Sequence, residues 1–137
     1  FDVYATQPYF LTERQLCIAD AGVHLLDLSR RIMGEVAHLS AETQQRNPRL
    51  QGEDTATILL RHTSGSVSLV EATYESRRLP DPFPETLIEV EGPEGAIAVT
   101  LGGQIELTRQ GRMRRSASRY RFATWMDNPK WAISQAG

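Results

Sequence analysis

Cysteine and lysine are almost missing from this chain. Among its 137 residues there is one cysteine, Cys17, and one lysine, Lys130. A single cysteine excludes an intramolecular disulfide and a zinc site built on cysteine pairs. No apolar run approaches the roughly 20 residues that cross a bilayer as a helix. The net charge of −2 gives no whole-chain attraction to nucleic acid or to an anionic membrane. These absences fit a cytoplasmic protein, and we expect neither nucleic acid nor membrane as a partner.

A dinucleotide-binding fingerprint is also missing. No Gly-x-Gly-x-x-Gly follows a predicted strand, so we expect this chain to hold no dinucleotide cofactor by itself. The length, with 40% hydrophobic residues, suffices for one domain with its own core. The chain begins at Phe1 without a methionine and stops shortly after an apolar segment. We therefore expect residues 1–137 to form a single domain of a longer protein.

Short alternating segments separated by turn residues fill most of the chain. Strands are predicted at residues 36–41, 55–63, 66–74, 86–91, 96–101, 104–109 and 113–121. One long helix precedes them. Thr12 and Gln15 resemble a capping box, so the helix begins there or nearer Ile18, and Gly34 is placed to end it. The pattern predicts an α+β fold with an open, mostly antiparallel sheet and helices on one face.

The predicted helix carries a polar stripe beside an apolar one. The polar stripe has the spacing i, i+4, i+7, i+11 and consists of Asp20, His24, Asp27 and Arg31. The apolar stripe lies one residue further and consists of Ala21, Leu25, Leu28 and Ile32. Imidazole titrates near neutral pH, and a carboxylate one turn away can orient it and stabilise its charged form. The spacing leaves two alternatives open: a partly buried, hydrogen-bonded histidine, and an exposed ion pair between Asp27 and Arg31.

This helix resembles the signature helix that opens the C-terminal domain of the glucose–fructose oxidoreductase, inositol dehydrogenase and MocA (Gfo/Idh/MocA) family. The residues that carry the resemblance are Asp20, Gly22, His24, Asp27, Leu28, Arg30 and the run Gly34-Glu35-Val36. It continues in Gly52-Glu53-Asp54-Thr55-Ala56, Ile88-Glu89-Val90-Glu91-Gly92 and Gly95-Ala96-Ile97. The resemblance covers roughly residues 15–100, and its specificity lies in the order and spacing of these pieces.

The resemblance implies a fold like the C-terminal domain of glyceraldehyde-3-phosphate dehydrogenase. It also implies hydride transfer between a sugar or cyclitol hydroxyl and NAD or NADP, with Asp20 and His24 facing the nicotinamide cleft. His24 would exchange a proton with the substrate hydroxyl or assist a lysine, and Asp20 would orient His24 and hydrogen-bond the substrate. The cofactor, its Rossmann domain and the lysine of a Glu-Lys-Pro motif would lie upstream of this chain. Lys130 does not match that motif.

Two hypotheses of function follow. In the first, the chain is the substrate-binding and oligomerisation domain of such an oxidoreductase. The loop of residues 77–85 then borders the pocket, with Arg77 and Arg78 as further substrate-binding residues. Apolar or small residues in both registers of the strands predict a homodimer, or an oligomer built from dimers, through the helix-free sheet face, unless further residues of the full protein cover that face. In the alternative, the chain is a non-catalytic binding or oligomerisation module of the same fold.

Other chemistries have less support in the sequence. Asp20 and His24 could share a divalent ion, but His38 and His62 lie on separate predicted strands without ligand spacing, and we expect no metal. Cys17 has apolar neighbours and is expected in the core. Basic residues near the C-terminus have no interleaved aromatics, which favours a charged sheet edge over a nucleic-acid site. They are Arg112, Arg114, Arg115, Arg119 and Arg121.

Overall fold

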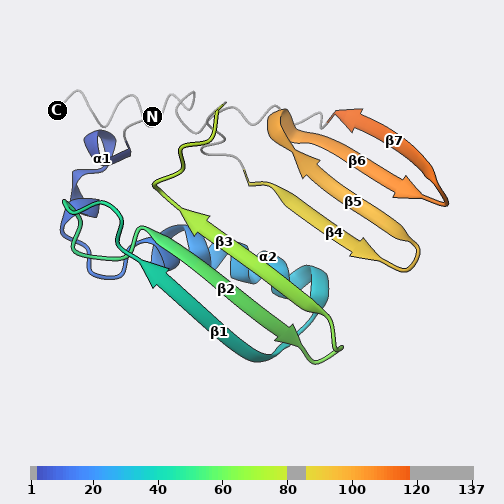
Figure 1. Cartoon of the computed structure of the whole chain (residues 1–137), viewed down its shortest axis with the longest axis horizontal. Coiled ribbons are helices and arrows are strands. Elements are labelled where there is room, and N and C mark those ends of the chain that lie inside the picture. The colour runs from blue at the N-terminus through green and yellow to red at the C-terminus, as the bar shows by residue number, and fades with distance from the viewer. Residues whose placement is uncertain (1–2, 80–85, 118–137) are drawn as a thin grey trace. The chain divides into compact units, whose positions relative to one another are not determined.

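The computed structural model describes residues 3–79 and 86–117 of the chain (Figure 1). Most of the predicted proline loop, together with Arg119, Arg121 and Lys130, lies outside the described residues. The chain divides into two compact units, Phe1–Arg77 and Arg78–Gly137. Across the described residues, no helix has the length and apolar character needed to cross a membrane.

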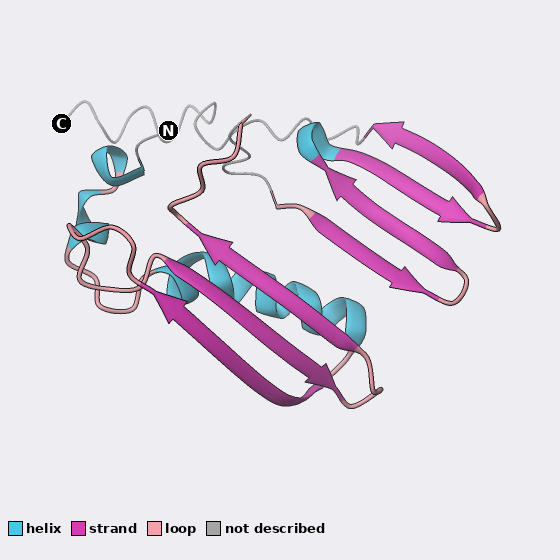
Figure 2. Ribbon diagram, in the orientation of Figure 1, coloured by secondary structure: helices cyan, strands magenta, loops and turns pink. Residues whose placement is uncertain are grey.

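The first unit is a three-stranded sheet with a helix on one face (Figure 2). A short helix α1 (Val3–Thr6) and a 3₁₀ turn (Pro8–Leu11) precede a π turn (Ile18–Gly22) and the helix α2 (Val23–Met33). The strands β1 (Val36–Gln44), β2 (Thr55–His62) and β3 (Val67–Thr73) follow. They pair antiparallel in the order β1-β2-β3. The predicted helix-then-hairpin order of this unit is confirmed.

The core of this unit lies between α2 and the central strand. Residues in β2 alternate strictly between buried and exposed, because successive side chains of a strand point to opposite faces. The buried cluster consists of Ala56, Ile58, Leu60 and Val70. Partly buried side chains that pack on it from the helix side are Ile18, Leu25, Leu26 and Val36. The apolar side chains of one helix face thus pack against the apolar side chains of one strand face.

The helix begins near Ile18, the second of the two predicted starts, and its end also agrees with the prediction. Residues 12–16 are not helical, and Thr12 instead donates from its hydroxyl to the Tyr9 carbonyl, 3.0 Å away. The capping-box prediction is therefore wrong. Helical structure starts near Ile18 in a π turn, in which the Val23 amide bonds to the Ile18 carbonyl. At the other end Gly34 has φ +92° and ψ −172°, a conformation that favours glycine, and closes the helix as predicted.

The second unit is a four-stranded antiparallel sheet, and its described residues include no α-helix. Its strands are β4 (Ile88–Gly92), β5 (Gly95–Thr100), β6 (Gln104–Arg109) and β7 (Arg112–Ala117), in the order β4-β5-β6-β7. Gly95 follows the tight turn after β4, and only glycine fits at this position. A Cβ on residue 95 would collide with the carbonyl oxygen of Thr108. The basic strand β7 is an edge strand of this sheet, as predicted.

The strands that we expected in one sheet belong to two. β2 and β3 pair with β1, whereas β4 and β5 pair with β6 and β7. The sequence fixes hairpins through their turns but does not indicate where one sheet ends, because the proline-containing link carries no pairing signal. The α+β class and the antiparallel pairing are confirmed.

The register of the second sheet collects its branched aliphatic side chains on one face. Val90 lies opposite Ile97, which lies opposite Leu107. Two residues along the strands, the next such row has Ile88 opposite Val99 and Val99 opposite Ile105. The intervening row has Glu89 and Glu106 on the other face. The sheet is therefore amphipathic.

Candidate functional site

Asp20 and His24 lie at the start of the helical segment and both are exposed. Asp20 belongs to the π turn and His24 to the first turn of α2. π turns are rare and occur frequently at functional sites. The imidazole of His24 is therefore not a packed core group, which was the alternative that the spacing left open. Within the described part of the chain, its ring nitrogens form no hydrogen bond.

Tyr74 is the residue that contacts Asp20. Its phenol hydroxyl donates a short hydrogen bond to Oδ2 of Asp20. Tyr74 directly follows β3, its ring packs on Phe10 with centroids 5.3 Å apart, and its amide donates to the Asp54 carbonyl over 2.9 Å. Burial raises the pKa of Tyr74 well above its usual range, and the Asp20 carboxylate raises that pKa further. The phenol therefore stays protonated and remains a hydrogen-bond donor to Asp20.

Sequence reasoning missed Tyr74. It ends the alternating segment after Thr73, and an aromatic residue at that place looks like an ordinary strand terminus. Its partner is 54 positions away in the sequence, so no local spacing links the two residues. The only available signal was that Phe10, Tyr74 and the other aromatics are few, at 7% of the chain.

Glu53 caps the helical segment from a distant part of the chain. Its carboxylate oxygen Oε1 accepts hydrogen bonds from the amides of Leu16 (3.2 Å) and Ile18 (3.1 Å). Its carbonyl accepts from the amide of Cys17, 3.1 Å away. Three consecutive amides at the start of a helix, which have no partner within the helix, are thus satisfied by one residue. Glu53 fixes where the helix begins.

Gly52 and Asp54 complete this contact. A Cβ on Gly52 would lie 2.7 Å from the carbonyl oxygen of Glu13 and 3.0 Å from that of Arg14, so only glycine fits. Asp54 is fully buried. Its Oδ2 accepts from the amides of Arg46 and Asn47, each at 2.7 Å. These contacts give a physical role to the Gly-Glu-Asp run on which part of the resemblance rested.

Cys17 lies beneath the same turn and is completely buried, as expected. Burial raises the pKa of its thiol to about 12, and the nearby carboxylates of Glu53, Asp54 and Asp20 contribute to the rise. A nucleophilic cysteine needs a lowered pKa and access to its reactant. This thiol has neither and serves as a small apolar core group.

The other predicted residues have simpler roles in the described structure. Arg31 and Asp27 form an exposed ion pair, with Nε and Oδ2 3.3 Å apart, so the ion-pair alternative is confirmed. Arg77 and Arg78 are exposed and follow Tyr74 by three and four residues. The predicted contacts of Arg77 and Arg78 with substrate stay predictions.

Two further histidines were weighed as metal ligands. His38 is exposed on β1. His62 is buried, with Nδ1 2.8 Å from the Gly34 carbonyl oxygen and Nε2 2.8 Å from Oγ of Ser68. The Gly34 carbonyl only accepts, so Nδ1 carries the hydrogen of that bond, and the Ser68 hydroxyl is the partner of Nε2. No group of three metal-ligating side chains occurs within residues 3–79 and 86–117.

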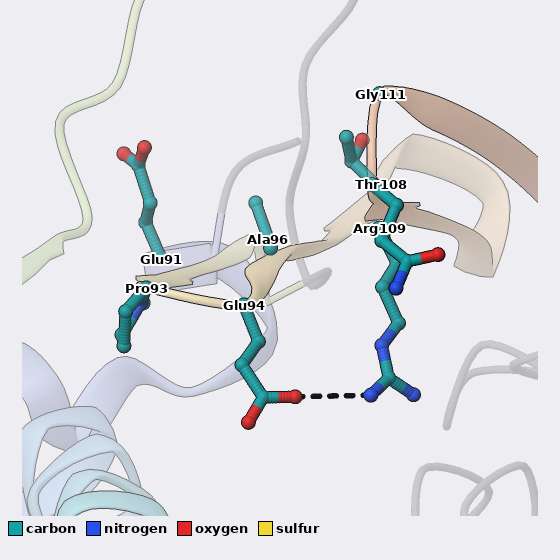
Figure 3. A pocket seen from close by; sticks show the side chains of 10 residues that line it. Glu91, Pro93, Glu94, Ala96, Thr108, Arg109 and Gly111 are labelled. Carbon is teal, nitrogen blue, oxygen red and sulfur yellow. Dashed lines mark hydrogen bonds and ion pairs between the residues drawn. The ribbon is translucent and has the colours of Figure 1, made fainter.

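A hollow of about 540 Å³ lies at the turns of the second sheet (Figure 3). The turn after β4 and the turn after β6 form it, and Glu94 and Arg109 face each other there with 3.0 Å between Oε2 and Nη2. Both side chains are largely exposed, so the pair is solvated. The hollow contains no histidine, cysteine or tyrosine and offers little for proton transfer.

Comparison with known proteins identifies the family. Residues 6–98 match the GFO/IDH/MocA C-terminal domain. The chain belongs to this family. The match spans the whole described part of the first unit beyond α1 and reaches into β5. It therefore contains Asp20, His24, Glu53 and Tyr74 together.

Curated relatives of this family member are sugar dehydrogenases. The chain is 40% identical over 136 residues to a D-apiose dehydrogenase of Rhizobium rhizogenes, and 37% identical over 136 residues to one of Paraburkholderia graminis. In each case 99% of the chain is covered, against 39% and 36% of the relative. The chain thus spans less than half the length of the curated relatives that it matches.

Solved structures show the same domain. An oxidoreductase of Agrobacterium radiobacter, crystallised with NAD+, L-tartaric acid and magnesium, is 38% identical with a TM-score of 0.85. The alignment covers 98% of this chain and 42% of that protein. A levoglucosan dehydrogenase in complex with NADH and levoglucosan is 20% identical with a TM-score of 0.63, over 76% of this chain and 32% of that protein. The second likeness concerns the fold alone.

Proposed function

We propose that this Gfo/Idh/MocA domain is the substrate-binding domain of an NAD(P)-dependent dehydrogenase that oxidises a hydroxyl of a sugar or polyol. The observation that carries the proposal is the exposed acid–imidazole pair Asp20 and His24 at the start of the helix, with Asp20 held by Tyr74. The names of the curated relatives support the substrate class, since both are D-apiose dehydrogenases.

The residues of this chain handle the proton of the reaction. A carbinol carbon releases hydride only as its oxygen loses a proton, so a base within hydrogen-bond reach of that oxygen is required. His24 is that base, with an exposed imidazole free to accept the proton. Asp20, held by the Tyr74 hydroxyl, binds a substrate hydroxyl through its remaining lone pairs and stabilises the charged imidazole. Arg77 and Arg78 are further substrate contacts in this proposal.

In this proposal the nicotinamide dinucleotide that accepts the hydride is bound outside the described residues. A pyrophosphate is normally held by a glycine-rich turn at a helix N-terminus. Here the amides at the helix start already donate to Glu53. The cofactor, NAD or NADP, must therefore be held by another part of the protein. A cytoplasmic location is also part of the proposal.

The activity can be tested in the full-length protein. Purified protein is mixed with NAD or NADP and with D-apiose, levoglucosan, myo-inositol or L-tartrate, and reduced cofactor is followed by absorbance. We expect His24→Asn to lower kcat by about 10²- to 10⁴-fold, the usual contribution of general acid–base catalysis. His38→Asn is the matched control, since His38 is also exposed but lies on β1. A wild-type protein without activity on any of these pairs would favour the non-catalytic module instead.

We also propose a homodimer, or an oligomer built from dimers, through the helix-free face of the first sheet. Leu59, Val67 and Leu69 are 48%, 53% and 64% exposed there, and polar side chains such as Thr57 and Glu71 surround them. A self-complementary contact around a twofold axis would bury this apolar group.

Sedimentation of the 15.4 kDa chain at micromolar concentration tests the dimer. We expect Leu69→Glu to give monomers. Leu39→Glu is the control, because Leu39 is 58% exposed but pairs with Leu60 and so lies on the helix side. A wild-type chain that sediments as a monomer rejects the dimer for the isolated chain and leaves further residues of the full protein to cover the face.

A further inference from the structure

One short segment contacts both halves of the candidate site. Residues 52–54, which we name the clasp, bind the start of the helical segment through Glu53 and the end of β3 through Asp54. Asp20 lies two residues after Ile18, whose amide Glu53 caps. The amide of Tyr74 donates a hydrogen bond to the Asp54 carbonyl. We propose that Glu53 is a positioning residue that sets the placement of Asp20 and His24 for proton transfer. This inference rests on the proposed function.

Within the described part of the chain, the helix start takes its side-chain cap from Glu53. Cys17, at the N-cap position of the π turn, gives no side-chain hydrogen bond. Both Oε1 contacts of Glu53 instead reach around Cys17 to the amides of Leu16 and Ile18. A carboxylate at this place is also favoured by the positive end of the helix dipole. Removing it frees the turn that carries Asp20 to rotate or to fray.

The rest of the clasp keeps Glu53 in reach. Gly52 passes so close to the Glu13 and Arg14 backbone that a side chain would push the segments apart. Asp54 is anchored by two amides of the loop after β1 and by the hydroxyl of Thr55, at 3.0 Å. With both neighbours fixed, the Glu53 carboxylate has a defined position relative to the helix. That is the property which a positioning residue requires.

Three substitutions at Glu53 separate the effect of its hydrogen-bond acceptor position from the effect of its negative charge. Glu53→Gln keeps an acceptor oxygen at the same reach and loses the charge. Glu53→Asp keeps the charge but is one methylene too short to contact both amides. Glu53→Ala loses the acceptor. We expect kcat in the order wild type, Gln, Asp, Ala, with the alanine variant down by about ten- to a hundredfold, as for a displacement of about 1 Å. KM should stay within a few-fold.

Hydrogen exchange of single amides measures the hydrogen bonds that Glu53 accepts, independently of activity. In Glu53→Ala, the amides of Leu16 and Ile18 should lose protection. The amide of Cys17 is an internal control, because it donates to the Glu53 carbonyl, which every substitution keeps. Both measurements are made in the full-length protein, well below its Tm, with Glu53→Gln as the rescue.

Each outcome decides the inference. Faster exchange at Leu16 and Ile18 with an unchanged kcat shows a purely structural cap and overturns it. A glutamine variant that keeps the Leu16 and Ile18 amides protected but is as impaired in kcat as the alanine variant shows that the charge of Glu53 acts on the reaction directly and not through the helix start, and also overturns it. If Glu53→Ala does not fold, the comparison of Gln with Asp carries the test. A wild type that is inactive with every substrate and cofactor rejects the proposed function, and with it the catalytic part of this inference.

Discussion

The two units of the chain differ in how far the apolar face of their sheet is shielded from solvent. In the first unit α2 covers one face, and Ile58 and Leu60 become 2% and 1% exposed. In the second unit the apolar face has no helix of its own among the described residues, and Ile97 and Leu107 remain 39% and 45% exposed. Strand pairing alone orders side chains by face, but only a second layer removes them from water.

The difference also separates where chemistry is placed. The first unit has a rigid core, buried polar groups with complete hydrogen bonding and an exposed acid–imidazole pair on its surface. The described part of the second unit has ion pairs in which at least one side chain is exposed, and a solvated hollow. A precise site needs support from packed neighbours, which the first unit supplies.

Truncation of one aliphatic residue in each unit should show the largest effect. Ile58→Ala is expected to lower the free energy of unfolding by about 2–5 kcal/mol, because it removes buried methyl groups and leaves a cavity. Ile97→Ala removes the same atoms from an exposed face and should cost less than about 1 kcal/mol. Urea denaturation followed by circular dichroism measures both. An equal cost at the two positions would break the comparison and mean that the second sheet is covered.

The reactivity of the Cys17 thiol toward a thiol reagent should show the next largest effect. At pH 8 the folded chain should react with a thiol reagent at least about a hundredfold more slowly than the unfolded chain, because the thiol is buried and protonated. The folded pKa of about 12 exceeds the unfolded value of 9.0. The resulting stabilisation is complete below pH 9 and is lost as the pH rises toward 12.

An exposed thiol in the second unit sharpens this test. Ser116→Cys, in a chain with Cys17→Ser, places the thiol on the edge strand β7, where Ser116 is exposed. It should react at nearly the same rate with and without urea. Slow reaction at position 116 in the folded chain would show that this edge is buried.

Surface ion pairs should differ least between the units. Arg31→Ala breaks the pair with Asp27, and Arg109→Ala breaks the pair with Glu94. Each is expected to change the free energy of unfolding by about 0.5 kcal/mol or less, since both pairs are solvent-screened. A loss above about 1 kcal/mol for Arg109→Ala alone would indicate that the hollow beside it is less hydrated than its exposure suggests.

The sequence predicted what local chemistry controls. Gly34 as the helix end, the hairpin turns and the Asp27–Arg31 pair depend on residues a few positions apart, and the structure confirms them. The resemblance predicted the family, and the comparisons confirm it. The roles of Asp20 and His24 stay predictions, because the structure shows their exposure and not a substrate.

Long-range contacts escaped prediction. The capping-box pattern at Thr12 was overruled because Glu53, 35 positions beyond Ile18, supplies the cap. The bond from Tyr74 to Asp20 joins the end of a strand to a π turn, and no periodicity indicates such a turn. The division into two sheets depends on which strand edges meet after folding.

The hydrogen bonds of His62 make a labelling reagent selective. Diethyl pyrocarbonate acylates an accessible, unprotonated imidazole nitrogen. The chain has three histidines, and His62 is 2% exposed with both nitrogens engaged by Gly34 and Ser68. Only His24 and His38 are therefore open to the reagent in the folded chain. In a His38→Asn background, the ultraviolet absorbance of carbethoxyhistidine would report on His24 alone, and protection by a bound sugar could be read directly as loss of that absorbance.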